Sequence, residues 1–184
     1  MSFSKQVELS ISKKSTQDIA LLSAGVGLLS ALAQISIPLP WTPVPITGQT
    51  FGVAVLSLGL GRRLGFASVV TYVFLGGLGA PIFANGKFGL SLGPTLGYLV
   101  GMMVASLVMG SLSDRAWHRS FWKCYLACIL GSLCTFGLGL FGLSFFVPKA
   151  SLLSAGLWPF VPGDLVKSLL ASGLVSSLAR LKAA

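Results

Sequence analysis

The charged side chains most able to do chemistry stand at the start of the last apolar segment. The stretch FVPGDLVKSLL, residues 160–170, contains Asp164 and Lys167 in a chain in which only 9% of residues are charged. Pro162 and Gly163 favour the start of a helix, so Asp164 should lie in the first turn, where the helix dipole favours a carboxylate. Lys167 should lie one turn further along the same face. Because this is the unfavourable end of a helix for a cation, we expect an anionic or strongly hydrogen-bonding group to face Lys167.

Composition places this pair in a membrane protein. Hydrophobic residues make up 54% of the chain, the mean hydropathy is +0.87, and 23 of the 184 residues are glycine. This leaves too little polar surface for a soluble globule, and abundant glycine suits helices that pack closely in lipid. Residues 1–18 are polar and contain no apolar run with a cleavage site. We therefore expect a cytoplasmic N-terminal segment and no removable signal peptide.

Apolar runs bounded by charge, proline or glycine predict an all-α integral membrane protein, a bundle of six transmembrane helices. The expected helices cover residues 19–37, 48–61, 64–80, 94–112, 124–147 and 163–179. They should form one membrane domain, residues 19–184. The second helix is short. At ~1.5 Å per residue it spans ~21 Å of a ~30 Å hydrocarbon core, so its flanks or its neighbours must complete it.

The basic residues predict the orientation of this bundle. Ten of the thirteen fall on one side of the predicted helices: Lys5, Lys13, Lys14, Arg62, Arg63, Arg115, Arg119, Lys123, Arg180 and Lys182. The other side has only Lys87, Lys149 and Lys167. By the positive-inside rule both termini should lie in the cytoplasm, and the chain should be a multi-pass protein of the cytoplasmic membrane. The net charge of +9 then reflects topology, and no basic stripe with interleaved aromatic residues indicates a nucleic-acid partner.

Groups that could run covalent or metal chemistry are scarce. The single histidine, His118, falls in the charged loop DRAWHRSFWK, and Cys124 and Cys128 have no further ligands at metal-site spacing. The sequence has no paired carboxylates and no phosphate-binding glycine loop. We therefore expect no metal, no cofactor and no enzymatic activity, which leaves binding or transport.

The loops on the outer side are rich in proline, glycine and aromatic residues. Residues 38–47, PLPWTPVPIT, could form a lid that places Trp41 over a cavity, or a rigid connector anchored at the interface by that tryptophan. Residues 80–93 contain the turn-forming pair Asn85-Gly86. A third outer loop, PFVPG at residues 159–163, introduces the last helix. We expect the three loops to converge around the start of that helix.

Two interpretations of Asp164 and Lys167 remain open on these grounds. The two side chains could form an i,i+3 ion pair near the interface, with a purely structural role. Alternatively they could bind a ligand, because an unpaired lysine in the bilayer costs roughly 3 kcal/mol and charged groups at this depth usually mark a substrate path.

Four motifs together resemble one known family. The stretches PLPWTPVPITGQT, LGAPIFANGKFG, LGPTLGYLVG and PGDLVKSLLA are similar to the sequence marks of the BioY family, the biotin-binding S components of energy-coupling-factor (ECF) vitamin transporters. The resemblance runs from about residue 19 to 175. It implies a six-helix S-component fold that takes up biotin from outside with a membrane coupling subunit and two ATP-hydrolysing subunits. Those partners would account for the missing nucleotide site.

The resemblance also implies which residues bind biotin. It carries over most directly to Asp164, which can accept a hydrogen bond from a ureido N–H, and to Lys167, which can donate to a carbonyl or pair with a carboxylate. Asn85 can do either, or could serve only in the turn. Tyr98 and Gln49 are further assignments, and each could instead be an ordinary interhelical hydrogen bonder.

A partner surface is implied on the first helix. Ala20 and Ala24 form a small-xxx-small step, and S components resemble one another in using such a step to meet the coupling subunit. Internal packing could produce the same pattern. Three alternative functions remain: an S component for another vitamin, a membrane scaffolding protein without a ligand, and, less favoured for want of catalytic groups, a membrane enzyme.

Overall fold

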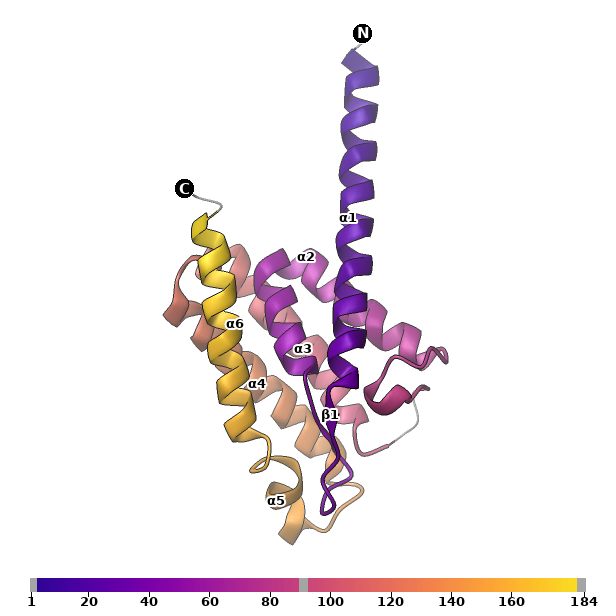
Figure 1. The fold of residues 1–184 in the computed structure, drawn as a ribbon, viewed down its shortest axis with the longest axis vertical. Helices are drawn as coiled ribbons and strands as arrows, with labels where there is room; N and C mark the ends of the chain where they lie inside the picture. The colour runs from indigo at the N-terminus through magenta and orange to yellow at the C-terminus, as the bar shows by residue number, and fades with distance from the viewer. Residues whose placement is uncertain (1–2, 90–92, 182–184) are drawn as a thin grey trace.

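The computed structural model describes residues 3–89 and 93–181, with side chains from residue 15 onward. The elements follow one another as α1 (Phe3–Gln34), β1 (Ser36–Ile37), β2 (Ile46–Thr47), α2 (Gln49–Gly77), η1 (Ala84–Gly86), α3 (Leu96–Asp114), η2 (Trp117–Arg119), α4 (Phe121–Leu143), η3 (Lys149–Ser151), α5 (Leu152–Gly156) and α6 (Val161–Leu181). Figure 1 shows these helices as one bundle, from which the N-terminal part of α1 projects. The side chains of Lys5, Lys13 and Lys14, and all of Lys182, lie outside the described part.

Four helices within the described part are long and apolar enough to cross a membrane. They comprise Ser15–Gln34 of α1, and α2, α3 and α4 in full. The last helix, α6, has 21 residues but carries Asp164, Lys167 and Arg180. These charges lower its hydropathy, although its outward face is apolar.

The element α2 consists of two antiparallel helices. Its backbone leaves the helical region at Gly61, with φ of 75° and ψ of −174°, a conformation that favours glycine. The two halves then lie side by side, since Gln49 bonds Tyr72 at 2.8 Å and a Cβ atom on Gly65 would stand 2.7 Å from the Cα atom of Ser57. The expected helices 48–61 and 64–80 therefore correspond to the two halves of α2.

The first and fifth helices end earlier than expected. The prediction for the first helix ran to residue 37, whereas α1 ends at Gln34 and Ser36–Ile37 pair with Ile46–Thr47 as an antiparallel hairpin. Pro38 disfavours helical backbone at the residue before it, which explains the extended conformation there. The fifth helix was expected to reach residue 147, but α4 ends at Leu143, and the short helix α5 follows, which the sequence did not indicate.

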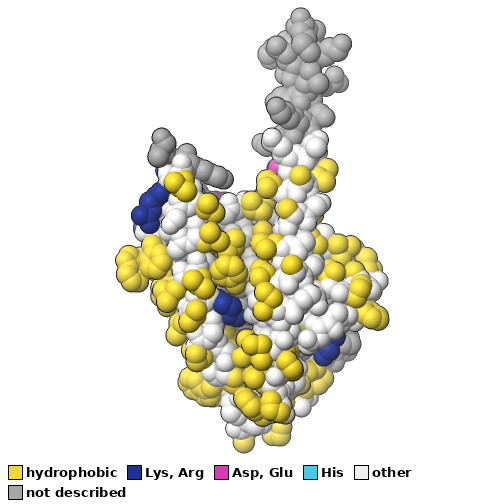
Figure 2. Space-filling model, in the orientation of Figure 1, with side chains coloured by type: hydrophobic (Ala, Val, Ile, Leu, Met, Phe, Trp, Pro, Cys, Tyr) yellow, Lys and Arg dark blue, Asp and Glu magenta, His cyan; other side chains and the backbone are white. Residues whose placement is uncertain are grey.

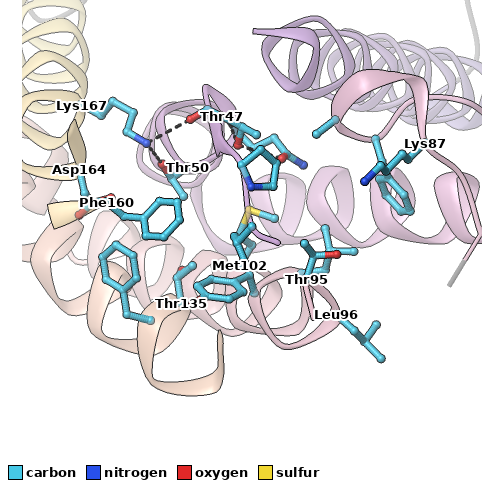
Figure 3. A pocket seen from close by; sticks show the side chains of 18 of the residues that line it. Thr47, Thr50, Lys87, Thr95, Leu96, Met102, Thr135, Phe160, Asp164 and Lys167 are labelled. Carbon is cyan, nitrogen blue, oxygen red and sulfur yellow. Dashed lines mark hydrogen bonds between the residues drawn. The ribbon is translucent and has the colours of Figure 1, made fainter. Parts of the chain in front are cut away.

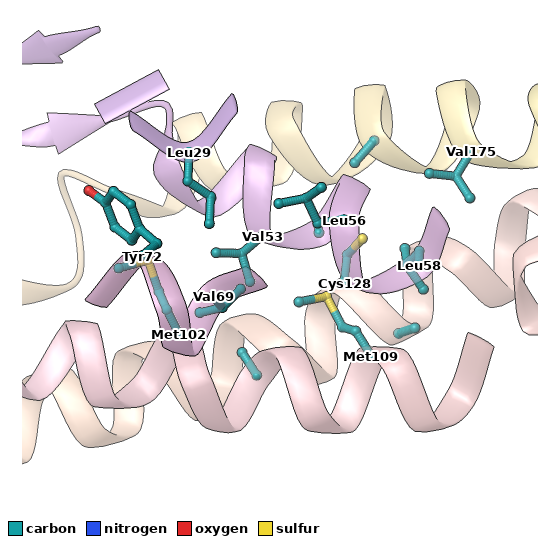
Figure 4. Packing of buried hydrophobic residues seen from close by; sticks show 14 of the residues in the cluster. Leu29, Val53, Leu56, Leu58, Val69, Tyr72, Met102, Met109, Cys128 and Val175 are labelled. Carbon is teal, nitrogen blue, oxygen red and sulfur yellow. The ribbon is translucent and has the colours of Figure 1, made fainter. Parts of the chain in front are cut away.

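Glycine lets α3 and α4 pack backbone against backbone. A Cβ atom on Gly101 would stand 2.8 Å from the Cα atom of Thr135, and one on Gly97 would stand 2.5 Å from the carbonyl oxygen of Leu138. Side chains from α1, α2, α3, α4 and α6 fill the remaining core, as Figure 4 shows for Leu29, Val53, Met102, Cys128 and Val175. This close approach suits helices associating in lipid, where packing replaces the hydrophobic effect between helices.

The helix α6 buries its polar face and exposes its apolar face. Asp164, Ser168, Ser172 and Ser176 follow one another at every fourth position, and all four are buried. The exposed face carries Leu165, Val166, Leu169, Leu170, Leu174 and Leu178. Figure 2 shows hydrophobic side chains spread along the visible faces of α6 and α1. This arrangement is typical of a helix with lipid outside and small polar partners inside.

Replacing Gly101 with alanine should destabilise the bundle. The added methyl group would force α3 away from α4 and lower the free energy of unfolding by about 1–3 kcal/mol. The matched control is Gly137→Ala in α4, where an added Cβ meets nothing within 4 Å. Both changes carry the same gain in helix propensity, so the difference between their thermal unfolding midpoints in detergent isolates packing. Equal midpoints would contradict this account of the α3/α4 contact.

Candidate ligand-binding site

A cavity of about 440 Å³ lies among the hairpin, the start of α2, the loop around η1, and the helices α3, α4 and α6 (Figure 3). Its volume is within the range usual for small-molecule sites. The lining residues are Val44, Pro45, Thr47, Gln49, Thr50, Phe83, Ala84, Gly86, Lys87, Phe88, Gly89, Thr95, Leu96, Tyr98, Leu99, Met102, Thr135, Phe136, Phe160, Asp164 and Lys167. The two outer loops and the start of the last helix thus meet at one cavity.

Asp164 reaches the cavity from the first turn of α6. Its carboxyl group is buried, with 6% of the residue exposed, and Ser132 of α4 donates a hydrogen bond of 2.5 Å to Oδ2. No other side-chain hydrogen bond to this carboxylate occurs within the described residues. Asp164 therefore retains capacity to accept donors from a ligand. Sequence reasoning missed Ser132, since it lies 32 residues away on another helix and belongs to no motif.

Lys167 forms hydrogen bonds with the end of the hairpin and the start of α2, and none with Asp164. Its Nζ atom donates to the carbonyl oxygen of Thr47 at 3.1 Å and to Oγ1 of Thr50 at 2.7 Å. Among the described side chains the one ion pair joins Arg63 to Asp18, so the i,i+3 pair of Asp164 and Lys167 is not formed. The direct ion pair of the structural interpretation is therefore absent among the described side chains, and a role of the two residues in ligand binding stays a prediction. One N–H of the ammonium group remains for a further acceptor.

Gln49 lines the cavity as part of a hydrogen-bonded chain. Thr47 Oγ1 donates to Gln49 Oε1 at 2.9 Å, Gln49 Nε2 donates to the hydroxyl of Tyr72 at 2.8 Å, and that hydroxyl donates to the carbonyl oxygen of Ile82 at 3.1 Å. This chain joins the hairpin, both halves of α2 and the loop that follows. The sequence did not single out Tyr72 as a functional residue, although the predicted helix 64–80 contains it.

Tyr98 lines the cavity from the first turn of α3. Its hydroxyl donates to the carbonyl oxygen of Gly156 at 2.7 Å, which ties α3 to α5. Its ring lies 6.4 Å from that of Phe160, centroid to centroid. The side chain therefore offers a ligand an aromatic surface, because its hydroxyl is already bonded.

Trp41 and Asn85 do not line the cavity. Trp41 is 63% exposed in the hairpin loop, whereas Val44 and Pro45 of the same loop form part of the wall. Asn85 is exposed in the turn η1, and its backbone is in the left-handed region, with φ of 58°. Its neighbours Ala84 and Gly86 line the cavity. The lining from these loops thus comes from residues beside those the sequence singled out.

The groups considered for metal or covalent chemistry lie elsewhere. A ring nitrogen of His118 approaches the carbonyl oxygen of Ser113 at 2.9 Å, at the end of the bundle that holds η2. Cys124 and Cys128 are buried in the core. Within the described residues no group of three or more His, Cys, Asp or Glu side chains could hold a metal ion.

The fold is similar to that of a solved transporter S component. It superimposes on the S-component for biotin from an ECF-type ABC transporter with a TM-score of 0.82, covering 91% of this chain and 93% of the other at 23% sequence identity. A sequence profile of the BioY family matches residues 4–184. The chain is 38% identical to a biotin transporter BioY of Thermotoga maritima, over 88% of this chain and 96% of the relative. It is also 36% identical to a probable biotin transporter BioY of Pyrococcus horikoshii, over 83% and 90%. The chain belongs to the BioY family.

Replacing Tyr72 with phenylalanine should weaken the wall of the cavity. The change removes the hydroxyl that accepts from Gln49 and donates to Ile82, which leaves the buried amide of Gln49 without its acceptor, so the free energy of unfolding should fall by about 1–3 kcal/mol. Tyr125→Phe in α4 removes a hydroxyl outside this chain of hydrogen bonds and serves as the control. Thermal unfolding in detergent measures both, and an equal loss of stability in the two variants would contradict the role given to Tyr72.

Proposed function

We propose that this chain is the biotin-binding subunit of a biotin uptake system, acting as an S component. Its membership of the BioY family and its likeness to an S-component structure support this. The observation that carries the proposal is the cavity itself. It holds a buried carboxylate and an ammonium group that are not paired with each other, beside an apolar wall.

The chemistry of biotin suits these groups. Its ureido ring has two N–H donors and one carbonyl acceptor, and its thioether ring is apolar. In our proposal Asp164 accepts from a ureido N–H, and Lys167 uses its remaining N–H for the ureido carbonyl oxygen. The rings of Tyr98 and Phe160 and the side chain of Met102 pack against the apolar part of the ligand. Gln49 supports the wall, and Asn85 forms the turn.

The bundle crosses the cytoplasmic membrane six times in this proposal. The crossings are α1, the two halves of α2, α3, α4 and α6, within one domain that follows the N-terminal segment. The bias of basic residues supports a cytoplasmic location for both termini. The cavity then opens to the outside, because the hairpin and the start of α6, which both line it, lie at the opposite end of the bundle from η2 and its basic loop.

Partners must provide the energy and the movement. We propose that a membrane coupling subunit and two ATP-hydrolysing subunits act with this chain, with the transported ligand as its only small-molecule partner besides lipid. No role for nucleic acid follows from the site. The face of α1 that carries Ala20, Ala24, Gly27 and Ala31 is exposed and lies opposite the face that buries Leu29 and Ala33. Small residues on this free face would let a coupling helix approach closely.

Biotin binding should depend on both charged residues. Asp164→Asn and Lys167→Met should each weaken biotin by on the order of 2 kcal/mol, about 30-fold in Kd, because each removes a charge-assisted hydrogen bond. Equilibrium binding to the purified chain in detergent measures this, with thiamine and riboflavin as comparison ligands. Lys149→Met provides a matched loss of charge outside the cavity and should bind biotin normally.

The double variant separates ligand binding from folding. Asp164→Asn with Lys167→Met should no longer hold biotin. Because the change also removes the bonds of Lys167 to Thr47 and Thr50, the thermal unfolding midpoint in detergent is measured beside binding to establish that the variant is folded. Tight binding of thiamine or riboflavin by the unmodified chain in place of biotin would assign it to another vitamin. A folded double variant with undiminished affinity for biotin would contradict the assignment of Asp164 and Lys167 to the binding site.

Bulky residues on the free face of α1 should block uptake and spare binding. Ala20→Leu with Ala24→Leu should reduce coupled biotin uptake in cells to near background, because a partner helix can no longer approach, while biotin affinity stays unchanged. Ser177→Leu enlarges an exposed position on α6 and is the control. Full uptake in the double leucine variant would remove this face from the interface.

A further inference from the structure

The hydroxyl group of Ser132 bonds to another helix, unlike the hydroxyl groups of several other serines in the bundle. Its bond runs from α4 to Oδ2 of Asp164 in α6, at 2.5 Å. A serine inside a helix can satisfy its hydroxyl with a carbonyl oxygen three or four residues earlier in the same helix. The serines that do so here are Ser30, Ser68, Ser106, Ser111, Ser172 and Ser176. Ser132 instead gives its one donor to the carboxylate.

The other polar neighbours of Asp164 are engaged elsewhere. A second cavity, of about 20 Å³, adjoins the ligand cavity, and the side chains with oxygen or nitrogen that line it are Thr50, Ser132, Thr135, Asp164, Lys167 and Ser168. Thr50 accepts from Lys167, as Figure 3 shows, and Thr135 donates to a carbonyl oxygen of its own helix. Among the described residues, Ser168 forms no side-chain hydrogen bond with Asp164. Within this part of the chain, Ser132 is therefore the one side chain that holds the carboxylate.

The position of Ser132 is fixed by the contact between α3 and α4. Its neighbour Gly131 lies so close to α3 that an added Cβ atom would stand 2.9 Å from the Sδ atom of Met109. Three residues after Ser132, Thr135 meets Gly101 backbone to backbone. A donor on two closely packed helices is held more precisely than one on a loop. The hydroxyl of Ser132 is thus in place before a ligand arrives.

A fixed carboxylate binds a ligand at a lower entropic cost than a mobile one. The side chain of Asp164 can rotate about two bonds, and ordering it only on binding would subtract from the affinity. The bond from Ser132 occupies Oδ2 and orders the carboxylate in advance. Oδ1 then remains to accept a donor, and its direction is set by the protein.

We propose that Ser132 is the positioning residue for Asp164, and that its hydrogen bond holds the carboxylate in the orientation in which it accepts from the ligand. Ser132 lines the small cavity and does not line the ligand cavity, so it acts through Asp164 and not by touching the ligand. This inference rests on the proposed function, because it takes biotin as the ligand and Asp164 as its acceptor.

A double-mutant cycle between Ser132 and Asp164 tests the inference. Equilibrium binding of biotin to the purified full chain would be measured for Ser132→Ala, for Asp164→Ala and for the two changes together. Ser132→Ala should weaken biotin by about three- to tenfold, which corresponds to the cost of ordering one side chain on binding. In the Asp164→Ala background the same change should alter the affinity by less than about twofold, because the hydroxyl then has no carboxylate to hold.

Three further variants separate positioning from general stability. Ser111→Ala removes a hydroxyl that bonds to Leu107 of its own helix, and it should leave biotin affinity unchanged. Ser132→Thr keeps the hydroxyl and should bind biotin more tightly than Ser132→Ala. Ser132→Cys has nearly the same shape with a weaker donor, so it should also weaken biotin. Thermal unfolding midpoints in detergent establish that each variant is folded.

The outcomes distinguish this inference from the proposed function. An equal loss of affinity from Ser132→Ala with and without Asp164 would show that the two residues act independently, and would overturn the inference. Undiminished affinity in both Ser132→Ala and Ser132→Cys would overturn it too. So would a threonine variant as weak as the alanine variant. Failure of the unmodified chain to bind biotin would instead overturn the proposed function.

Discussion

The hydrogen bonds of Lys167 hold the two sides of the cavity together. Its ammonium group joins α6 to the carbonyl oxygen of Thr47 and the hydroxyl of Thr50, residues 120 and 117 positions earlier in the chain. These bonds fix the end of the hairpin and the start of α2 against the last helix. They also satisfy a cation in apolar surroundings with neutral oxygens. Among the described side chains no cation forms an ion pair with Asp164, and its carboxylate therefore keeps capacity to accept donors from a ligand.

The rest of the bundle is built so that these groups can meet. Glycines bring α3 and α4 into backbone contact, and the turn at Gly61 folds the two halves of α2 against each other. The helices are therefore close where side chains are small. At the cavity the side chains are large, among them Phe160, Tyr98 and Met102, and they enclose a space that suits the apolar part of a ligand.

The polar face of α6 links the site to the core. C-terminal to Asp164 on the same face of α6, Ser168, Ser172 and Ser176 are buried against the bundle. The hydroxyl of Ser172 donates to the backbone carbonyl oxygen of Ser168 at 2.6 Å. Each hydroxyl can be satisfied by its own helix, so a polar face can be buried at little cost. The opposite face is rich in leucine and meets lipid in our proposal. Hydropathy alone passes over this helix, because the charges that form the site offset its apolar residues.

Much of the fold could be predicted from local sequence. Apolar runs located the helices, and the charged break at Gly61, Arg62 and Arg63 separated the two halves of α2. The same patterns failed at Ser36–Ile37, which form a strand, and at α5, because pairing with a distant strand and packing of a five-residue helix leave no periodic signal.

The sequence by itself determined the class of protein, the positions of its helices and the concentration of charge at Asp164 and Lys167. These follow from composition and spacing, which are local properties. Only the tertiary structure decided the partners of those charges. Ser132 contacts Asp164, and Thr47 and Thr50 contact Lys167. These partners come from elements far away in the chain, and a sequence motif does not indicate such contacts.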